Sequence, residues 1–292
     1  MPKPLPLTER SFRSRPPNWC PGCGDFGIWT ALKRALVTLQ LKPDQLTIVF
    51  GIGCSGNMVN VVRAYGFHGL HGRTLPVAEG IRLANHKLPV IVVGGDGDGL
   101  GEGIGHFIHA IRANPNVTYI LHDNQVYGLT KGEHSPTAPK GFVSTTAPTG
   151  VIEEPVNPIG LALAAGASFV SRGFAGDLDS LETLLVAAIR HQGLALVDVL
   201  QPCVTFNHHN TYLWYYQRVY QLSNVQHDPS KLDLAWRRAQ EPMDEKIPVG
   251  IFFQTKRPTL ESQLPPLQGG RTLLEQQPVR PVDISAVVAQ YQ

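Results

Sequence analysis

Charge is scarce in this chain, and the charges that are present nearly cancel. Asp, Glu, Lys and Arg make up 16% of the 292 residues, and 25 basic against 23 acidic residues leave a formal net charge of +2. Proteins that bind nucleic acid or an anionic membrane surface carry basic stripes or clusters. We therefore expect neither nucleic acid nor a membrane as a partner.

Long apolar runs are absent as well. No run reaches the roughly 18 residues that a membrane-spanning helix needs, and residues 1–19 lack the apolar core of a secretory signal. We therefore expect a cytoplasmic protein. A hydrophobic content of 42% suffices for a sizeable core, while 29 glycines and 24 prolines indicate many turns. One large α/β domain with extensions, or two small domains, would suit this length.

Cysteine is rare, yet all four cysteines stand in turn-like contexts. Cys20 and Cys23 flank a Pro-Gly pair, Cys54 lies in a glycine-rich stretch, and Cys203 follows a proline. Core thiols, the plain alternative, usually have apolar neighbours. Nothing suggests export, so disulfides are not expected. Four thiolates complete the shell of a zinc ion or a four-iron cluster, and we expect one such shared site.

The spacing of apolar residues predicts helices that alternate with short buried strands. Such alternation indicates an α/β fold with a doubly wound parallel sheet, covered by helices on both faces and connected by right-handed crossovers. The predicted helices cover residues 25–40, 76–87, 102–113, 157–166 and 178–192, and the predicted strands cover 46–50, 89–94, 117–122, 168–171 and 194–200.

Polar or sulfur-bearing residues follow four of these strands. Cys54 comes after the first strand, Asp96 after the second, Asn124 after the third and Cys203 after the last. Ligands of an open parallel sheet bind outside the carboxyl ends of its strands. The four turns should therefore meet at one edge of the sheet.

The stretch from Gly51 to Gly56 matches the Gly-x-Gly-x-x-Gly fingerprint of dinucleotide-binding turns. A nicotinamide site also needs an acidic residue at the end of a second strand, about 20 residues further on. Residues 66–73 contain no acid, and the first one beyond them is Glu79. We therefore set dinucleotide binding by this turn aside.

The second strong pattern is Gly-Asp-Gly at residues 95–97, with Asn124 following after 26 intervening residues. The Asp96 carboxylate, the Asn124 amide oxygen and a backbone carbonyl near Val126 are oxygen ligands suited to Mg²⁺ beside a diphosphate. A helix beginning near Glu102 would direct its N-terminus at the phosphates. An ordinary Asp- and Gly-rich turn is the simpler alternative. The paired spacing favours the magnesium diphosphate site, with both side chains on surface turns.

The patterns recur in an order that resembles one enzyme family. The Gly-Asp-Gly and Asn spacing resembles the thiamine diphosphate motif, and it occurs with Cys-Pro-Gly-Cys-Gly, Gly-Ile-Gly-Cys-Ser, His-Gly-Arg and Tyr-Gly-Leu-Thr-Lys-Gly. From about residue 18 to about residue 222 the chain resembles the β subunit of 2-oxoacid:ferredoxin oxidoreductases. The resemblance implies the diphosphate-binding half of a thiamine diphosphate-binding fold, with a C-terminal extension.

The resemblance implies two metal sites. Mg²⁺ would be held by Asp96, Asn124 and the Val126 carbonyl. The ligands of a [4Fe-4S] cluster would be Cys20, Cys23, Cys54 and Cys203.

The resemblance also implies cofactor and catalytic residues. His71, Arg73 and Lys131 would lie near the cofactor and the substrate, although a solvated His and Arg in a glycine-rich loop are the plain alternative. The residues expected to bind the cofactor are Gly53, Cys54, His71, Gly95, Asp96, Gly97, Asp98, Asn124, Val126, Gly128, Leu129 and Thr130.

An activity follows from the resemblance. Such enzymes use thiamine diphosphate and coenzyme A to convert a 2-oxo acid to an acyl-CoA and CO2, and electrons pass through the cluster to ferredoxin. The glutamate that activates the cofactor lies on a partner α subunit, so we expect a heterodimer or a dimer of heterodimers. The stretch around Lys131 resembles members that act on 2-oxoglutarate, which is therefore the expected substrate, with succinyl-CoA as product. Glu133 replaces the Gln usual there.

Three alternatives remain open. The first is a non-catalytic, zinc-stabilised module that binds a phosphate ligand, although Cys54 and Cys203 lie farther along the chain than compact zinc modules require. The second is a thiamine-dependent carboligase or decarboxylase without a cluster, which leaves the four cysteines unexplained. The third is a member of the same family that prefers pyruvate.

The chain divides into three expected parts. Residues 1–18 form an N-terminal arm, residues 19–204 form the α/β domain that binds the cofactor and the cluster, and residues 205–292 form a C-terminal extension. That extension is expected to pack on the partner subunit or to cover the cofactor edge. Residues 131–150 read as a loop over the site, and the aromatic residues 212–221 as a helix on the core or at the partner interface.

Overall fold

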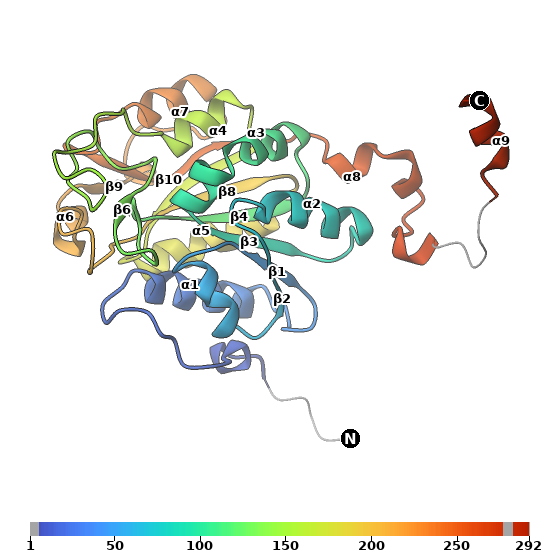
Figure 1. The fold of residues 1–292 in the computed structure, drawn as a ribbon, viewed down its shortest axis with the longest axis horizontal. Helices are drawn as coiled ribbons and strands as arrows, with labels where there is room; N and C mark the ends of the chain where they lie inside the picture. Colours follow the sequence, from blue (N-terminus) through green and yellow to red (C-terminus); the bar gives the residue numbers. More distant parts are fainter. Residues whose placement is uncertain (1–5, 277–282, 292) are drawn as a thin grey trace.

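An eight-stranded sheet organises the computed structural model, which describes residues 6–276 and 283–291. Figure 1 shows the sheet in the middle of the molecule, with helices above and below it. In spatial order its strands are β2 (Tyr65–His68), β1 (Thr47–Phe50), β3 (Val90–Gly95), β4 (Val117–Asp123), β8 (Ala195–Leu200), β7 (Phe169–Phe174), β10 (Ile247–Gln254) and β9 (Val219–Gln221).

Most neighbouring strands in this sheet are parallel. The exception is the antiparallel pair of β7 and β10. β9 pairs with β10 in parallel, so both run opposite to the other strands. The parallel register joins β1, β3, β4 and β8 so that all four end at the same edge. The expected doubly wound α/β fold is thus confirmed, in a mixed but mostly parallel form.

Two helical layers bury the two faces of the sheet. Neighbouring residues of a strand point to opposite faces, and in β1 Ile48 joins one core cluster while Val49 joins the other. The first layer consists of α1 (Asp25–Thr38) and α5 (Leu178–Arg190), and the second consists of α2 (Thr74–Ala84), α3 (Ile104–Ala113), α4 (Pro158–Ala164) and α7 (Leu232–Ala239).

Local sequence signals explain where these helices begin. The Asp177 side chain accepts a hydrogen bond from Ser180 N at the start of α5, and Asn157 caps α4, whose first residue is Pro158. Leu181, Leu185 and their neighbours then recur at helical spacing and are buried against the sheet.

Short elements complete the described chain. β5 (Val126–Tyr127) and β6 (Glu133–His134) form a separate two-stranded ribbon. The remaining helical turns are η1 (Glu9–Phe12), η2 (Gly56–Asn60), η3 (Gly97–Glu102), α6 (Tyr212–Tyr216), η4 (Leu222–Asn224), α8 (Leu260–Gln263), η5 (Pro265–Leu267), η6 (Leu274–Gln276), α9 (Ser285–Val288) and η7 (Ala289–Tyr291).

The sheet continues beyond residue 204, where the extension was expected to begin. β9 and β10 widen the sheet, and Ala235 and Ala239 of α7 are buried in one of its cores. Much of residues 205–254 therefore belongs to the α/β body. Residues 1–5 of the expected arm, and residues 277–282 and 292 of the expected extension, lie outside the described residues. None of the helices in the described ranges is long and apolar enough to span a membrane.

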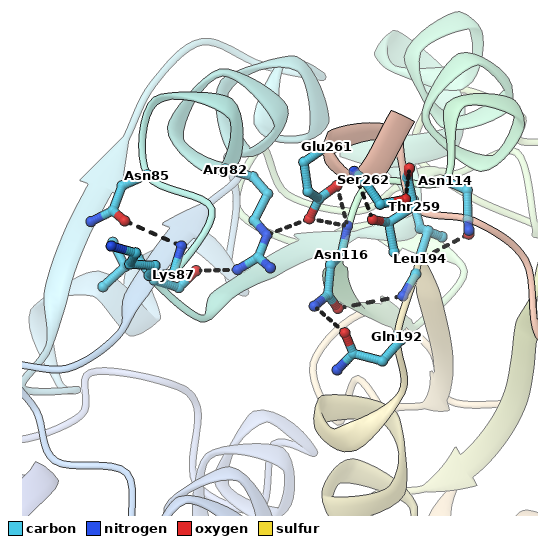
Figure 2. A network of polar contacts seen from close by, with 12 residues as sticks. Arg82, Asn85, Lys87, Asn114, Asn116, Gln192, Leu194, Thr259, Glu261 and Ser262 are labelled. Carbon is cyan, nitrogen blue, oxygen red and sulfur yellow. Dashed lines mark hydrogen bonds and ion pairs between the residues drawn. The ribbon is translucent and has the colours of Figure 1, made fainter. Parts of the chain in front are cut away.

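The segment after β10 is anchored at the amino ends of the strands. Arg82 Nε of α2 donates a hydrogen bond of 2.6 Å to Glu261 Oε1 of α8, and both side chains are buried. The backbone N–H of Asn116, just before β4, also donates to Glu261. Figure 2 shows these side chains converging from α2, α8 and the start of β4. α8 thus docks at the edge opposite to the polar turns, and it does not cover the expected cofactor edge.

We expect the replacement of Glu261 with Ala to destabilise this docking strongly. Arg82 would keep its bond to the Leu88 carbonyl but lose its buried counter-ion, and breaking such a pair costs about 3–5 kcal/mol of unfolding free energy. Urea unfolding followed by circular dichroism measures the loss. Glu154→Ala, which breaks an exposed pair with Lys140, is the control and should leave the curve nearly unchanged. Equal curves for both variants would contradict this account.

Candidate functional site

A cavity opens at the carboxyl ends of β1, β3 and β4, where the polar turns were predicted to meet. All twelve residues expected to bind the cofactor line it, together with Ile52, Ser55 and Tyr127. The described structure thus brings the glycine-rich turn after β1, the Gly-Asp-Gly turn after β3 and the turn after β4 around one space. Arg73 and Lys131, expected near the substrate, do not line it.

Asp96 is the most firmly held carboxylate in the cavity. Its side chain is buried, and three donors share its Oδ2 atom: Gln125 N at 2.8 Å, Ser135 Oγ at 2.6 Å and Thr137 Oγ1 at 2.5 Å. The expected surface position of Asp96 was therefore wrong, because the loop that follows β6 covers it, and Asn124, also expected on the surface, is buried as well. Burial raises the pKa of Asp96, while the three hydrogen bonds oppose the rise. A cation at Oδ1 would stabilise the charged form.

The loop at residues 131–150 reaches the site through two hydroxyls that the sequence did not single out. Ser135 and Thr137 both bond to Asp96, and Thr137 Oγ1 also lies 2.8 Å from Asp123 Oδ1. The signal available in the sequence was weak, since it consisted of a Ser and a Thr in a Pro-rich stretch. Through these contacts the loop covers Asp96, which agrees with its expected position over the site.

Asn124 and Val126 are positioned by a sharp reversal of the chain. Gln125 adopts φ 67°, a left-handed conformation that side-chain-bearing residues rarely take. Val126 N then donates to Asn124 Oδ1 at 3.0 Å, and Asn124 Nδ2 donates to Gln201 Oε1 at 2.8 Å. The amide orientation is thus fixed at both ends, with a second lone pair of Oδ1 left for another partner.

The Asp98 side chain connects three loops through polar contacts. Its Oδ1 accepts hydrogen bonds from Ile52 N at 3.2 Å and Gly72 N at 2.8 Å, and His71 Nδ1 lies 2.9 Å from the same oxygen. Burial raises the pKa of Asp98. Gly51 has to be a glycine here, because a Cβ would lie 2.1 Å from Asp98 Oδ2. Asp98 therefore lines the cavity mainly as an organiser of its loops.

The helical turn after Asp96 differs from the predicted one. A wide π-type turn, η3, starts at Gly97, and α3 begins only at Ile104. The Tyr127 ring packs against this turn, and its hydroxyl donates to the Gly97 carbonyl at 3.2 Å. A Cβ on Gly97 would lie 2.5 Å from that ring. The first N–H groups beside the cavity thus belong to η3 rather than to a helix starting near Glu102.

Arg73 and Lys131, the two cations predicted to lie near the substrate, differ in the hydrogen bonds that their charged groups make. Arg73 Nη1 donates to the carbonyls of His71, Gly72 and Glu102, so its guanidinium braces the loop. Lys131 is exposed and follows the cavity residue Thr130, with φ 86°. Thr130 Oγ1 donates to Glu133 Oε2 at 2.7 Å. Lys131 is therefore the freer of the two cations.

The four cysteines converge beside the cavity. Trp19 Nε1 donates to the Cys54 carbonyl at 2.8 Å, and Gly24 N donates to the Pro202 carbonyl at 3.0 Å, so the three cysteine-bearing segments are bonded to one another. A Cβ on Gly128 would lie 3.4 Å from Cys54 Sγ and 3.8 Å from Cys203 Sγ. Gly128 also lines the cavity, so Cys54 Sγ and Cys203 Sγ lie directly beside a residue of the cavity lining.

The protonation of these thiols depends on burial. Cys23 and Cys203 are buried, Cys54 is half-buried and Cys20 is exposed, and all four are free thiols. Burial, with Asp25 and the neighbouring thiols as smaller causes, raises the pKa of Cys54 to about 12, and burial also raises the pKa of Cys23 and Cys203. A cationic guest would be needed to hold them as thiolates.

Four thiols are a donor set known both for zinc ions and for four-iron clusters. Among the described residues, no three His, Cys, Asp or Glu side chains stand close enough to hold a single metal ion. A four-iron cluster places each thiolate on a different iron, so its ligands are spread around a larger object. The residue that sequence reasoning missed here is Gln201, whose Nε2 donates to Cys23 Sγ at 3.3 Å. Its place directly before Pro202 and Cys203 was the available signal.

Comparisons with known proteins agree with this arrangement. The family described as "Thiamine pyrophosphate enzyme, C-terminal TPP binding domain" matches residues 51–199. A second family, which describes the C-terminal part of the pyruvate ferredoxin oxidoreductase beta subunit, matches residues 203–269. This second match agrees with a body that continues past residue 204.

Individual relatives extend the match over most of the chain. A 2-oxoacid:ferredoxin oxidoreductase subunit beta from Saccharolobus solfataricus is 46% identical over 255 residues, which cover 82% of each chain. A 2-oxoglutarate synthase subunit KorB from Methanocaldococcus jannaschii is 33% identical over 257 residues, covering 85% of this chain and 92% of that protein.

A solved structure shows the same fold. The 2-oxoglutarate:ferredoxin oxidoreductase from Magnetococcus marinus, with 2-oxoglutarate, coenzyme A and succinyl-CoA bound, contains a chain that is 37% identical, with a TM-score of 0.89. The match covers 100% of this chain and 98% of that one. With the cavity, the converging cysteines and these likenesses taken together, the chain belongs to the β subunits of the 2-oxoacid:ferredoxin oxidoreductases.

Proposed function

We propose that this chain holds the diphosphate end of thiamine diphosphate with Mg²⁺, and a [4Fe-4S] cluster beside it. With an α subunit it would oxidatively decarboxylate a 2-oxo acid, with 2-oxoglutarate as the favoured substrate, and form the acyl-CoA from coenzyme A, with ferredoxin as electron acceptor. The observation that carries the proposal is that Cys54 and Gly128 both line the cofactor cavity, and that a Cβ on Gly128 would lie 3.4 Å from Cys54 Sγ and 3.8 Å from Cys203 Sγ.

Mg²⁺ would be held by oxygen atoms that the turns already orient. Asp96 has Oδ2 occupied by three donors, which leaves Oδ1 for the ion. Asn124 Oδ1 accepts one hydrogen bond from Val126 N and keeps a second lone pair for the ion, while the amide nitrogen is bound to Gln201. The Val126 carbonyl would be the third protein ligand, and diphosphate and water would complete an octahedron. These residues would fix the diphosphate end of the cofactor through the ion.

Cofactor chemistry defines what the chain has to supply. When bound, the thiazolium ring accepts the electron pair released as CO2 leaves the 2-oxo acid. The protein's part is to hold the diphosphate, to place His71 at the cavity and to keep the sulfur ligands adjacent. Because Cys54 lines the same cavity, a cofactor and a cluster bound here would be neighbours, which would suit electron transfer between them.

The remaining half of the active site would come from the α subunit, with which the chain would form a heterodimer or a dimer of heterodimers. Exposed apolar side chains lie in the segments that follow β4 and β8, among them Leu129, Val143, Ile152 and Leu213. They favour a partner on this side of the sheet, because exposed apolar surface often marks an interface. The described residues after α8 would pack on that partner as well. Free thiols at a cluster site favour a reducing compartment, which we propose is the cytoplasm.

Substitution of single cysteines tests the cluster. With Ser at position 20, 23, 54 or 203, we expect each α/β complex to lose iron relative to the wild type, because a hydroxyl is a poor substitute for a thiolate on iron. Iron and sulfide are counted per complex after anaerobic purification, and visible absorption near roughly 400 nm follows the cluster. Wild-type iron content in all four variants would rule out this ligand set.

The magnesium site is tested by Asp96→Asn and Asn124→Ala. Asp96→Asn keeps the shape of a buried side chain but removes its charge, and Asn124→Ala removes an oxygen ligand. We expect thiamine diphosphate to bind at least about tenfold more weakly to each complex in the presence of Mg²⁺. Calorimetric titration measures the affinity, with Asp179→Asn, an exposed aspartate on α5, as the control. Undiminished affinity in both variants would show that the turn has another role.

Substrate preference is tested at Lys131. A fixed cation is needed for the distal carboxylate of 2-oxoglutarate, because an unpaired carboxylate is costly to desolvate. In the α/β complex, Lys131→Ala should lower kcat/KM for 2-oxoglutarate by about tenfold or more, with a much smaller effect on 2-oxobutyrate. Lys140→Ala, on the same loop, is the control. Equal losses for both substrates would assign Lys131 to another role, and a wild-type preference for pyruvate would overturn the substrate assignment.

A further inference from the structure

Gln201 lies between the proposed magnesium site and the proposed cluster. It directly follows β8, and its backbone N–H donates to the Asp123 carbonyl at 2.9 Å, which extends the pairing of β8 with β4 by one residue. The residue is 1% exposed. The strand pairing therefore fixes the Gln201 backbone, and its side chain is confined between Asn124 and Cys23.

On one side Gln201 orients Asn124. Gln201 Oε1 accepts a hydrogen bond of 2.8 Å from Asn124 Nδ2. A rotated Asn124 amide would place two oxygens against each other at this position, and it would also lose the bond from Val126 N to Asn124 Oδ1. Gln201 thus selects the amide orientation that presents an oxygen, the ligand Mg²⁺ prefers, on the Val126 side.

On the other side Gln201 faces a sulfur. Its Nε2 lies 3.3 Å from Cys23 Sγ, as a hydrogen-bond donor to that atom. Cys23 Sγ also lies 3.4 Å from Asp25 Oδ2, a contact that needs the thiol proton. The Gln201 amide N–H is thus the donor that faces this sulfur. Hydrogen bonds to cluster sulfurs stabilise the reduced, more negative state and raise the reduction potential.

Packing prevents the Gln201 side chain from leaving this position. A Cβ on Gly24 would lie 2.6 Å from Gln201 Cγ and 3.0 Å from Pro202 Cδ. The glycine that follows Cys23 is therefore required for the close approach of the two segments. A single amide is thereby held with its oxygen toward one site and its nitrogen toward the other.

We propose that Gln201 is a positioning residue shared by the two sites, which orients Asn124 for the metal through Oε1 and sets the potential of the Cys23-ligated cluster through Nε2. The proposal rests on the proposed function, because it presumes both the Mg²⁺ site and the cluster. It goes beyond that function by linking the two sites through one side chain.

Gln201→Met tests the link in the purified, anaerobic α/β complex. Methionine has a similar size but neither donates nor accepts a strong hydrogen bond. We expect a more negative midpoint potential of the cluster, measured by a redox titration followed by electron paramagnetic resonance. We also expect the Mg²⁺ concentration needed for half-maximal thiamine diphosphate binding to rise by about tenfold. Gln217→Met, at an exposed glutamine just after α6, should change neither quantity.

Gln201→Glu separates the two contacts and serves if the methionine variant fails to assemble. The glutamate keeps an oxygen for Asn124 but places a second oxygen against Cys23 Sγ. The Mg²⁺ requirement should therefore stay near the wild-type value, while the potential still falls. Full iron content with both quantities unchanged in Gln201→Met would overturn the proposal, as would a shift in only one of them. A wild-type complex without iron, or without Mg²⁺-dependent cofactor binding, would instead overturn the proposed function.

Discussion

The shared direction of β1, β3, β4 and β8 is the constraint on which the site depends. Strands that run parallel and in register end at one edge, so the turns that follow them must meet there. Cys54, Asp96, Asn124 and Cys203 come from distant parts of the sequence and are gathered by this geometry alone. The helical layers and the α8 anchor then stabilise the sheet without occupying that edge.

Electrostatics at this edge favours a cationic guest. Burial raises the pKa of Asp96, Asp123 and Asp198; the charges of Asp198 and Asp96 further raise that of Asp123, and the charge of Asp96 further raises that of Asp198. Arg172 pairs with Asp198 at 2.8 Å, which leaves the charge of Asp96 to the cavity. A divalent ion there would compensate a carboxylate whose other oxygen is already committed to three donors.

Much of this organisation could be predicted from the sequence, because its determinants are local. Apolar runs such as residues 89–94 mark buried strands, and a Gly-Asp-Gly turn after one of them marks a phosphate site. β2 was missed because its four residues are all exposed and carry no apolar run. β10 was missed because Pro248 and Gly250 interrupt it within a Pro-rich region, although tertiary pairing with β7 holds it in the sheet.

The contacts between loops could not be predicted in the same way. That Thr137 bonds to Asp96, or that Gln201 reaches both Asn124 and Cys23, depends on how segments far apart in the sequence pack. No spacing rule connects these residues. The same holds for Arg73, whose motif suggested a substrate cation but whose guanidinium is bound by three carbonyls.

The position of β10 has a consequence for biosynthesis. Cys20, Cys23 and Cys54 leave the ribosome long before Cys203, and β10, which borders β7 in the sheet, emerges later still. A nascent chain that ends before Cys203 carries three of the four thiols but not the complete sheet edge at which they meet. Domains generally fold as units, so the place where the four thiols meet would be complete only after synthesis has passed residue 254.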